Sequence, residues 1–306
     1  MIKTFAKIEK NKGIAIALGF FDGMHLGHRK IIKTLVSESI KRGLKTAVVT
    51  FSQNPANYFS EKPIPNIQSS KERELILDEL GVDYLYELDF EEYKNLLAGE
   101  YLSDVLVKYF QPKLIVAGYN HTFGADVKDS SFLQDCKLDY RYDCIIVPEV
   151  LYENKEEVSS TIIRKHIAHG HLNAANALLG RNFSIRNSVI TGKKLARNLG
   201  YPTANIVWPD SIVKLPYGVY FGYAVVEEKI IPALIAWGIS PSTSADREEK
   251  LEAHLYDFDK NIYGKIMRLI FVKKLRNEEY FPTIALLKEQ LDSDWEVFEQ
   301  WAKQRF

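Results

Sequence analysis

The chain has 306 residues, of which 46% are hydrophobic and 26% charged, a composition that is typical of a folded globular protein and excludes a disordered chain. Lys+Arg and Asp+Glu both number 40, and this zero net charge excludes the strongly basic surface of a nucleic-acid-binding domain. A neutral chain can still bind small anions, because glycine-rich turns and helix N-termini bind phosphate without net positive charge. At roughly 150 residues per domain, the length predicts two domains.

The cysteines and the first apolar run indicate the cellular environment. Cys136 and Cys144 are too few for a disulfide framework and lack zinc-site spacing, so we expect reduced, structural thiols in a cytoplasmic protein. The apolar run 14–21 is too short to span a bilayer. Asp22 and Gly23 follow it where a signal peptide would have a cleavage site, so we expect neither a signal peptide nor a membrane partner.

The first half of the chain alternates apolar runs with stretches of helical periodicity. Short apolar runs predict buried strands, and apolar residues three or four positions apart predict helices. The predicted strands are 14–18, 46–51, 84–88, 114–117 and 144–147, and the predicted helices are one from about Leu26 that stops at Gly43, 73–80 and 101–110. This order predicts a doubly wound, Rossmann-like parallel sheet.

The pattern changes after Gly180. Residues 161–179 have helical periodicity with a break at Gly170, whereas the following runs are short, partly alternating and separated by turn residues. The predicted strands are 184–191, 218–226, 230–237, 250–257 and 265–275, and a last helix is predicted over 284–291. Such a series is typical of an antiparallel barrel or sandwich. We place the boundary near 179–183, giving domains 1–180 and 181–306.

Residues 19–28 connect the first strand to the first helix and are rich in glycine. Ligands of parallel sheets bind at the carboxyl ends of the strands, and glycines let the backbone approach a bulky anion. The helix N-terminus offers free N–H groups, and His25 and His28 add imidazole donors at the same end. We therefore predict that both histidines stabilise charge in a transition state. The spacing matches neither a Walker A motif nor GxGxxG, and no third zinc ligand is evident.

The segment GFFDGMHLGH resembles the GxFDGxHxGH signature of the nucleotidylyltransferase superfamily, whose members bind ATP at this loop and release pyrophosphate. Residues 158–164 resemble the ISSTxIR motif of the same superfamily, and residues 118–124 resemble the GxDFxFG segment of bacterial flavin adenylyltransferases. The residues that these resemblances imply for ATP binding are Gly19, Phe20, Asp22, Gly23, Gly27, Gly118, Asn120, Phe123, Ser159, Ser160, Thr161 and Arg164. Of these, Arg164 could bind phosphate oxygens as a planar fork.

The second half carries a further motif, because LGYPTAN at 199–205 resembles the LGFPTAN of riboflavin kinases. Thr203 and Asn205 offer neutral oxygens, which suit Mg²⁺ and the phosphates of ATP. Pro202 fixes the approach of the chain. Upstream, Gly192 and Lys193 are interpreted as part of a loop over the phosphates of ATP.

Residues 251–255, LEAHL, resemble the strand that carries the catalytic glutamate of riboflavin kinases. Strand alternation directs Glu252 and His254 away from the apolar face formed by the other three residues. The resemblance makes Glu252 the candidate general base for a primary hydroxyl.

Together these segments cover nearly the whole chain, which is similar to the bacterial bifunctional riboflavin kinase/FAD synthetase family. The resemblance implies a six-stranded Greek-key barrel with a terminal helix behind the adenylyltransferase domain. It implies synthesis of FMN from riboflavin and of FAD from FMN, with ATP and Mg²⁺ in both steps, and flavin contacts at Asn54, Arg276 and Phe281. We expect a monomer or weak homo-oligomer that binds these small molecules and no nucleic acid.

Four positions depart from the family pattern. Asn54 stands where the family has a histidine, Asn120 where it has an aspartate, and Ala196 where it has a glycine. Residues 237–243 lack the arginine expected after Gly238. These departures leave two alternatives open: a flavin- or nucleotide-binding regulatory protein, or a single-activity enzyme with one impaired half.

Overall fold

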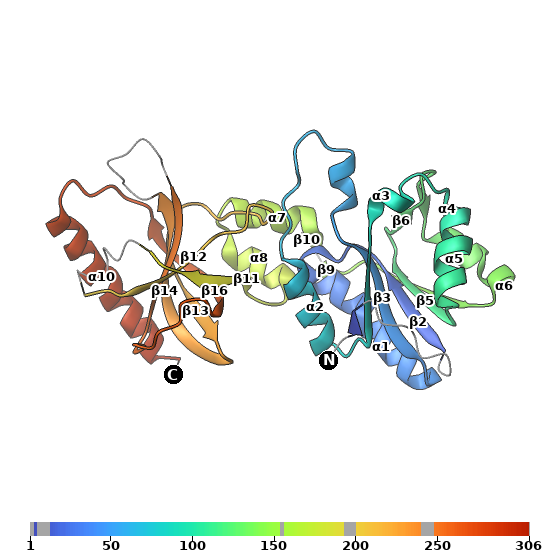
Figure 1. Cartoon of the computed structure of the whole chain (residues 1–306), viewed down its shortest axis with the longest axis horizontal. Helices are drawn as coiled ribbons and strands as arrows, with labels where there is room; N and C mark the ends of the chain where they lie inside the picture. Colours follow the sequence, from blue (N-terminus) through green and yellow to red (C-terminus); the bar gives the residue numbers. More distant parts are fainter. Residues whose placement is uncertain (1–2, 5–12, 154–155, 193–199, 240–247, 306) are drawn as a thin grey trace. The chain divides into compact units, whose positions relative to one another are not determined.

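The computed structural model describes residues 3–4, 13–153, 156–192, 200–239 and 248–305, and the chain forms two compact units, Met1–Ser160 and Thr161–Phe306 (Figure 1). Of the predicted features, Lys193, Ala196 and most of the segment after Gly238 lie outside the described residues.

The first unit is built on a six-stranded sheet with the order β1-β4-β3-β2-β5-β8, in which every pair of neighbours is parallel. The strands are β1 (Lys3–Thr4), β2 (Ile14–Leu18), β3 (Lys45–Phe51), β4 (Tyr84–Leu88), β5 (Leu114–Gly118) and β8 (Asp143–Val147). The predicted parallel sheet is confirmed, and the five predicted strands agree to within one residue at each end. Strand β1 was not predicted, because two polar residues give no apolar run.

Helices cover both faces of this sheet, because alternate strand residues belong to different cores. In β2, Ala15 and Ala17 belong to one cluster and Ile14, Ile16 and Leu18 to the other. Helices α1 (Leu26–Arg42) and α2 (Ser70–Glu79) pack on the first cluster, and the π-helix η3 (Tyr101–Phe110) and α5 (Ser131–Asp135) on the second. Both faces are therefore buried, as a doubly wound sheet requires.

The ends of the helices follow local capping rules. Helix α1 ends at Gly43, whose φ of 64° is left-handed, as the predicted stop requires. Helix α2 begins three residues before the prediction, because the side chain of Ser69 accepts the backbone N–H of Glu72. The remaining elements of this unit are η1 (Asp22–Met24), η2 (Pro55–Tyr58), α3 (Phe90–Tyr93), α4 (Ala98–Glu100), β6 (Thr122–Phe123), β7 (Lys128–Asp129), α6 (Lys137–Tyr140), β9 (Leu151–Tyr152) and β10 (Glu156–Glu157).

The second unit is a closed six-stranded barrel with the order β11-β12-β15-β14-β13-β16, in which the described neighbours pair antiparallel. Its strands are β11 (Phe183–Ile190), β12 (Thr203–Ile206), β13 (Gly218–Val226), β14 (Lys229–Ile239), β15 (Glu249–Leu255) and β16 (Ile266–Asn277). Of the two predicted architectures the barrel is correct, and the predicted strands shift by at most two residues. Strand β12 was not predicted, because it is short and half polar.

Helices flank the barrel in sequence. Helices α7 (Ser160–Ala168) and α8 (Leu172–Leu179) precede it, with the predicted break at Gly170 between them, and α10 (Ile284–Lys303) follows it. Helix α10 runs to Lys303 and not to residue 291, because Phe298 and Ala302 pack against Phe221 of β13. Within the described part of the chain, no helix combines the length and apolar character needed to cross a membrane.

Candidate active sites

The loop between β2 and α1 has an unusual backbone. Phe21 and Met24 have left-handed φ angles of 57° and 43°, and Gly23 between them has a φ of 80°. A left-handed non-glycine residue costs about 1–3 kcal/mol, so tertiary contacts must impose this turn. The side chains of Phe21 and Met24 are 1% and 0% exposed, and burial of these two anchors supplies such contacts. A side chain at Gly23 would bring a Cβ within 2.9 Å of Ile67.

The carbonyl groups of this loop accept hydrogen bonds from side chains outside it. The donors are Arg73 Nη1 and Thr50 Oγ1 to Phe20, Gln68 Nε2 to Phe21, Ser160 Oγ to Asp22 and Arg29 Nε to Met24, at distances of 2.9–3.2 Å. Asp22 is 4% exposed, and its carboxylate accepts the backbone N–H of Ile67 at 2.8 Å. The path of the loop backbone is therefore fixed by four other segments of the chain.

His25 and His28 lie face to face at the N-terminus of α1, with ring centroids 3.6 Å apart. His25 caps the helix, because its Nδ1 accepts the backbone N–H of His28 at 3.3 Å. Neutral His25 must therefore carry its proton on Nε2, which becomes a donor. Burial, with a smaller contribution from His25, holds the pKa of His28 well below its ordinary value. Among the described residues the buried Nδ1 of His28 has no hydrogen-bond partner.

The other predicted residues of the first unit lie at the same carboxyl edge of the sheet, because β3 and β5 flank β2. Gly118 ends β5, where a side chain would bring a Cβ within 3.1 Å of Ile31 in α1. Asn120 is exposed just beyond it, and the ring of Phe123 stacks on that of His121 with centroids 5.7 Å apart.

Asn54 follows β3, and its Oδ1 accepts the backbone N–H of Ala56. The structure thus gathers three of the predicted loop segments along one edge.

The residues of the 158–164 motif are divided between the two units. Ser159 is partly buried, and Ser160 contacts the signature loop through the bond to Asp22 described above. Thr161 and Arg164 belong to the second unit, where Arg164 Nη2 donates to Thr161 Oγ1 at 3.3 Å.

In the barrel, two paired strands bring the predicted kinase residues together. In the ladder between β12 and β15, Asn205 lies opposite Glu252 and Thr203 lies opposite His254. Thr203 Oγ1 donates to Glu252 Oε2 at 3.0 Å. The predicted alternation is present, since Glu252 and His254 are half-buried while the three residues around them are buried. His254 Nδ1 donates to the carbonyl oxygen of Pro202 at 2.6 Å, which fixes the start of β12.

A cavity of about 570 Å³ adjoins these strands. It is lined by four of the residues that the sequence analysis assigned to ATP binding in the second half: Gly192, Pro202, Thr203 and Asn205. Asn205 is only 8% exposed, and a side chain at Gly192 would bring a Cβ within 2.5 Å of its amide nitrogen. The sequence analysis missed residues 258–262, which line the same cavity after β15. This connection has no periodicity or glycine motif that marks it as part of a site.

Arg276 and Phe281, predicted to contact flavin, lie at the end of β16 and before α10. Arg276 holds the buried Asp294 of α10 through Nε and Nη2 at 2.7–3.0 Å, and its guanidinium lies 5.8 Å from the Phe281 ring centroid. Asp294 is 3% exposed, so this fork is an intramolecular ion pair that joins the barrel to α10.

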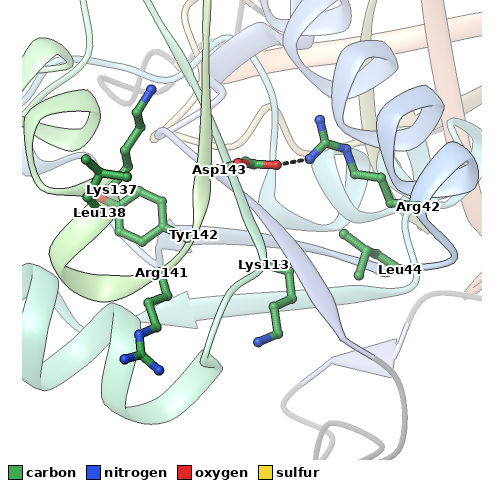
Figure 2. Close-up of a pocket in the computed structure, with 8 residues that line it drawn as sticks. All are labelled: Arg42, Leu44, Lys113, Lys137, Leu138, Arg141, Tyr142 and Asp143. Atoms are coloured by element: carbon green, nitrogen blue, oxygen red, sulfur yellow. Dashed lines mark hydrogen bonds and ion pairs between the residues drawn. The ribbon is translucent and has the colours of Figure 1, made fainter.

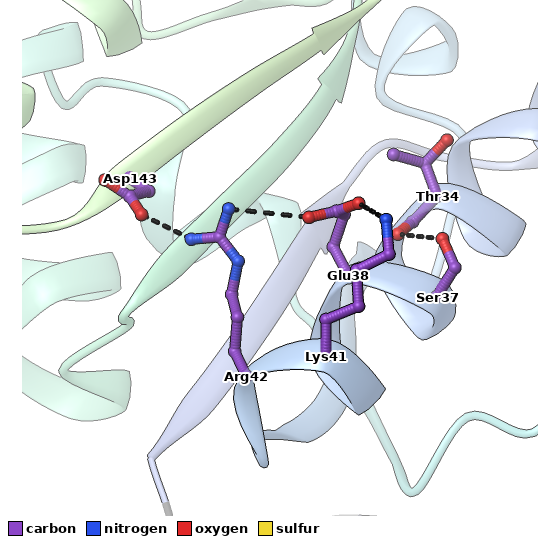
Figure 3. A network of polar contacts seen from close by, with 6 residues as sticks. All are labelled: Thr34, Ser37, Glu38, Lys41, Arg42 and Asp143. Carbon is purple, nitrogen blue, oxygen red and sulfur yellow. Dashed lines mark hydrogen bonds and ion pairs between the residues drawn. The ribbon is translucent and has the colours of Figure 1, made fainter.

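A second cavity, of about 500 Å³, lies at the opposite edge of the parallel sheet, where β3, β5 and β8 begin (Figure 2). Arg42, Lys113 and Arg141 line it, and it contains none of the predicted site residues. Arg42 pairs with Asp143 and also with Glu38, which accepts a hydrogen bond from Lys41 at 2.6 Å (Figure 3). Basic side chains at the end of α1 complement the helix dipole, which accounts for Lys41 and Arg42 without a ligand.

Comparisons with known proteins agree with this division. A family model described as FAD synthetase matches residues 7–162, and one described as riboflavin kinase matches residues 179–302. A curated bifunctional riboflavin kinase/FMN adenylyltransferase from Buchnera aphidicola subsp. Schizaphis graminum is 32% identical over 98% of this chain and 97% of its own length. Relatives with the same name from Bacillus subtilis and Escherichia coli K12 are also 32% identical and cover 94% and 92% of this chain.

A crystal structure from Streptococcus pneumoniae, described as a macrolide-efflux protein, matches with a TM-score of 0.84 and 32% identity over 96% of both chains. Its description concerns that protein, whereas the two family models and the curated relatives agree with each other over nearly the full chain. The two models match in the order of the two structural units, and the chain belongs to the family of bifunctional riboflavin kinase/FMN adenylyltransferases.

Proposed function

We propose that this chain converts riboflavin to FMN in its barrel unit and FMN to FAD in its parallel-sheet unit, with ATP as the second substrate of each step. The observation that carries this proposal is that each unit contains its own set of motif residues in contact: the stacked His25–His28 pair in one and the Thr203–Glu252 pair in the other. We assign residues 1–180 to the formation of FAD from FMN and residues 181–306 to the formation of FMN from riboflavin.

In the barrel, the 5′-hydroxyl oxygen of riboflavin attacks the γ-phosphorus of ATP. The new oxygen–phosphorus bond forms as the bond from the γ-phosphorus to the β–γ bridging oxygen breaks, and ADP leaves. Glu252 takes the hydroxyl proton, and the hydrogen bond from Thr203 holds its carboxylate in place. Most of the acceleration comes from positioning and charge neutralisation, as in other phosphoryl transfers.

The donor set around Thr203 fits Mg²⁺. Thr203 and Asn205 offer neutral oxygens and Glu252 a carboxylate, all hard ligands of the kind that Mg²⁺ prefers. We assign Thr203 and Asn205 as the residues that hold Mg²⁺ and ATP, and the ion would neutralise phosphate charge when bound. Gly192 serves this arrangement because any side chain there would collide with Asn205.

In the parallel-sheet unit, a phosphate oxygen of FMN attacks the α-phosphorus of ATP. The bond from the α-phosphorus to the α–β bridging oxygen breaks, and pyrophosphate leaves. No side-chain nucleophile is needed, so the protein contributes donors to the developing charge. His25 through Nε2–H, His28 and the N-terminus of α1 supply these donors.

The two asparagines that depart from the family pattern keep part of their chemistry. Asn54 uses Oδ1 to cap η2, which leaves its amide NH₂ as a neutral donor toward the phosphate of FMN. Asn120 is exposed at the carboxyl edge of the sheet. Its neutral amide oxygen can accept one hydrogen bond from adenine or ribose, although it lacks the negative charge of an aspartate. We therefore propose that both activities are retained.

One incubation tests the proposal. The protein is mixed with riboflavin, ATP and Mg²⁺, and flavins are separated by chromatography over time. We expect FMN first and FAD later, with one pyrophosphate released for each FAD formed. FMN without FAD would indicate a single-activity enzyme, and tight flavin binding without either product would indicate a regulatory protein.

We further propose a cytoplasmic protein that is a monomer or weak homo-oligomer and that releases FMN to solvent between the two steps. The two cysteines support the first point, because burial raises the pKa of Cys144 to about 11 and also raises that of Cys136, which makes both thiols poor nucleophiles. Sedimentation velocity over a range of protein concentrations tests the oligomeric state.

A further inference from the structure

Arg73 of α2 is a buried arginine that sequence motifs did not mark. Its side chain is 4% exposed. Nη1 donates to the carbonyl oxygen of Phe20 at 3.0 Å, and Nη2 donates to that of Phe51 at 3.3 Å and pairs with Glu87. Its guanidinium carbon also lies 5.2 Å from the centroid of the Phe20 ring. One guanidinium therefore contacts three separate segments.

These three segments follow or form neighbouring strands. Phe20 lies in the loop after β2, Phe51 ends β3, and Glu87 lies in β4, and these strands are adjacent in the sheet. The guanidinium thus connects the carboxyl ends of three strands at the edge where the signature loop lies. A planar fork with donors in fixed directions is needed for this, because a lysine ammonium is a single point on a flexible stem.

Stability alone does not explain this buried charge. A buried ion pair is often no more stable than an apolar pair of similar size. In addition, the buried Nε of Arg73 has no hydrogen-bond partner among the described residues, which costs stability. A residue that is costly for the fold and that contacts a site loop points to a role in that site.

We propose that Arg73 is a positioning residue for FMN adenylylation. By holding the carbonyl of Phe20, it fixes the entry into the left-handed turn at Phe21, Gly23 and Met24, and so the place of His25 at the start of α1. By holding the carbonyl of Phe51, it fixes the exit of β3 toward Asn54. This inference rests on the proposed role of the signature loop in adenylyl transfer. Arg73 acts through the backbone and does not touch the substrates.

Changing Arg73 alone would leave Glu87 as a buried unpaired carboxylate, and the unit could fail to fold for that reason. The informative variant is therefore the double substitution Arg73→Met/Glu87→Gln, which removes both charges and keeps the side-chain volumes. We expect its thermal midpoint to stay close to that of the wild type. We expect kcat for FAD formation from added FMN to fall about 100-fold, with KM for ATP changed less, because a misplaced loop weakens transition-state contacts more than ground-state binding.

A matched control lies at the amino-terminal ends of β3 and β4, the two strands that contribute Phe51 and Glu87. Lys45 begins β3 and pairs at 2.5 Å with Asp83, which directly precedes β4. The double substitution Lys45→Met/Asp83→Asn removes this pair far from the carboxyl edge, and we expect FAD formation to be unchanged. FMN formation from riboflavin in the barrel serves as an internal measure of intact protein in every variant.

The outcomes separate the two proposals. His28→Ala is assayed beside the double variant, and wild-type FAD formation in His28→Ala would refute the proposed role of the loop itself. Loss in His28→Ala, together with wild-type kcat in a folded Arg73→Met/Glu87→Gln, would refute the positioning role of Arg73. If the double variant melts well below the wild type, Arg73→Lys decides: it keeps the charge opposite Glu87 but cannot reach both carbonyls, so an unchanged kcat refutes the proposal and a tenfold fall supports it.

Discussion

The two proposed sites of this molecule are constructed in different ways. In the parallel-sheet unit the site is a backbone shape, a left-handed turn whose carbonyls are held by side chains from four other segments. In the barrel the site is a pair of side chains, Thr203 and Glu252, that strand register brings into contact. The first site should therefore be sensitive to packing far from the substrates, whereas the second should depend mainly on the few residues that contact them.

We expect the largest change in rate, and so the sharpest test of this difference between the two sites, from Glu252→Gln. The amide keeps the shape of the side chain but cannot take a proton, so FMN formation should fall by about 10²–10⁴-fold. FAD formation from added FMN should be unaffected, since it occurs in the other unit. Separate assays with riboflavin and with FMN measure the two rates, and an equal loss of both would contradict the division of labour.

His28→Ala should give the converse result with a somewhat smaller effect. Removal of one preorganised donor to developing charge typically costs about 10²–10³-fold in kcat. FAD formation should fall by this factor while FMN formation stays at the wild-type rate. His169→Ala is a matched control, because it removes an exposed histidine whose contacts are the backbone carbonyl of Lys165 and the ring of His171. Similar losses in the two variants would point to a general structural effect.

Gly192→Ala should have a moderate effect on the barrel only. The added Cβ would lie 2.5 Å from Nδ2 and 2.7 Å from Cγ of Asn205, so the amide side chain or the loop must shift. We expect KM for ATP in FMN formation to rise about tenfold, in line with loss of one good contact of about 1.4 kcal/mol. Steady-state kinetics at varied ATP concentration measures this, and a change in FAD formation would mean that the two sites are coupled.

The smallest effect is a dependence of stability on pH in the parallel-sheet unit. Burial lowers the pKa of His121 from 6.5 to about 4 and that of His28 well below 6.5. Below pH 6.5 the unfolded chain takes up protons that the folded unit does not, so the free energy of unfolding should fall as the pH drops from 6.5 toward 4. Thermal melts across this range test the trend. His121→Gln should reduce the slope, and an unchanged slope would show that His121 does not contribute.

The sequence predicted the framework of both units because their patterns are local. The apolar runs of β2 to β8 marked the parallel sheet, and Gly43 and Gly170 marked helix ends. The motifs also predicted which loops lie together, since loops that leave neighbouring parallel strands share one edge. The contact between Thr203 and Glu252 depends on the register of β12 and β15, which motif resemblance could suggest but not fix.

What the sequence did not reveal depends on contacts between distant residues. Arg73 lies 53 positions from Phe20, and nothing in its local pattern distinguishes it from a solvent-exposed helical arginine. Helix α10 was predicted too short, because the residues that extend it are mostly polar and its packing on the barrel rests on a few residues such as Phe298 and Ala302. The lining of the barrel cavity by residues 258–262 follows from where β15 ends, which periodicity does not specify.

The carbonyl contacts of the signature loop have a thermodynamic consequence. Because these contacts form as the chain folds, the loop has its final shape before ATP reaches the proposed site, and we expect little backbone entropy to be lost on binding. Folding of the first unit and its affinity for ATP are therefore linked. ATP in excess should raise the melting temperature of this unit, and destabilising substitutions in α2 should be partly masked at high ATP concentration.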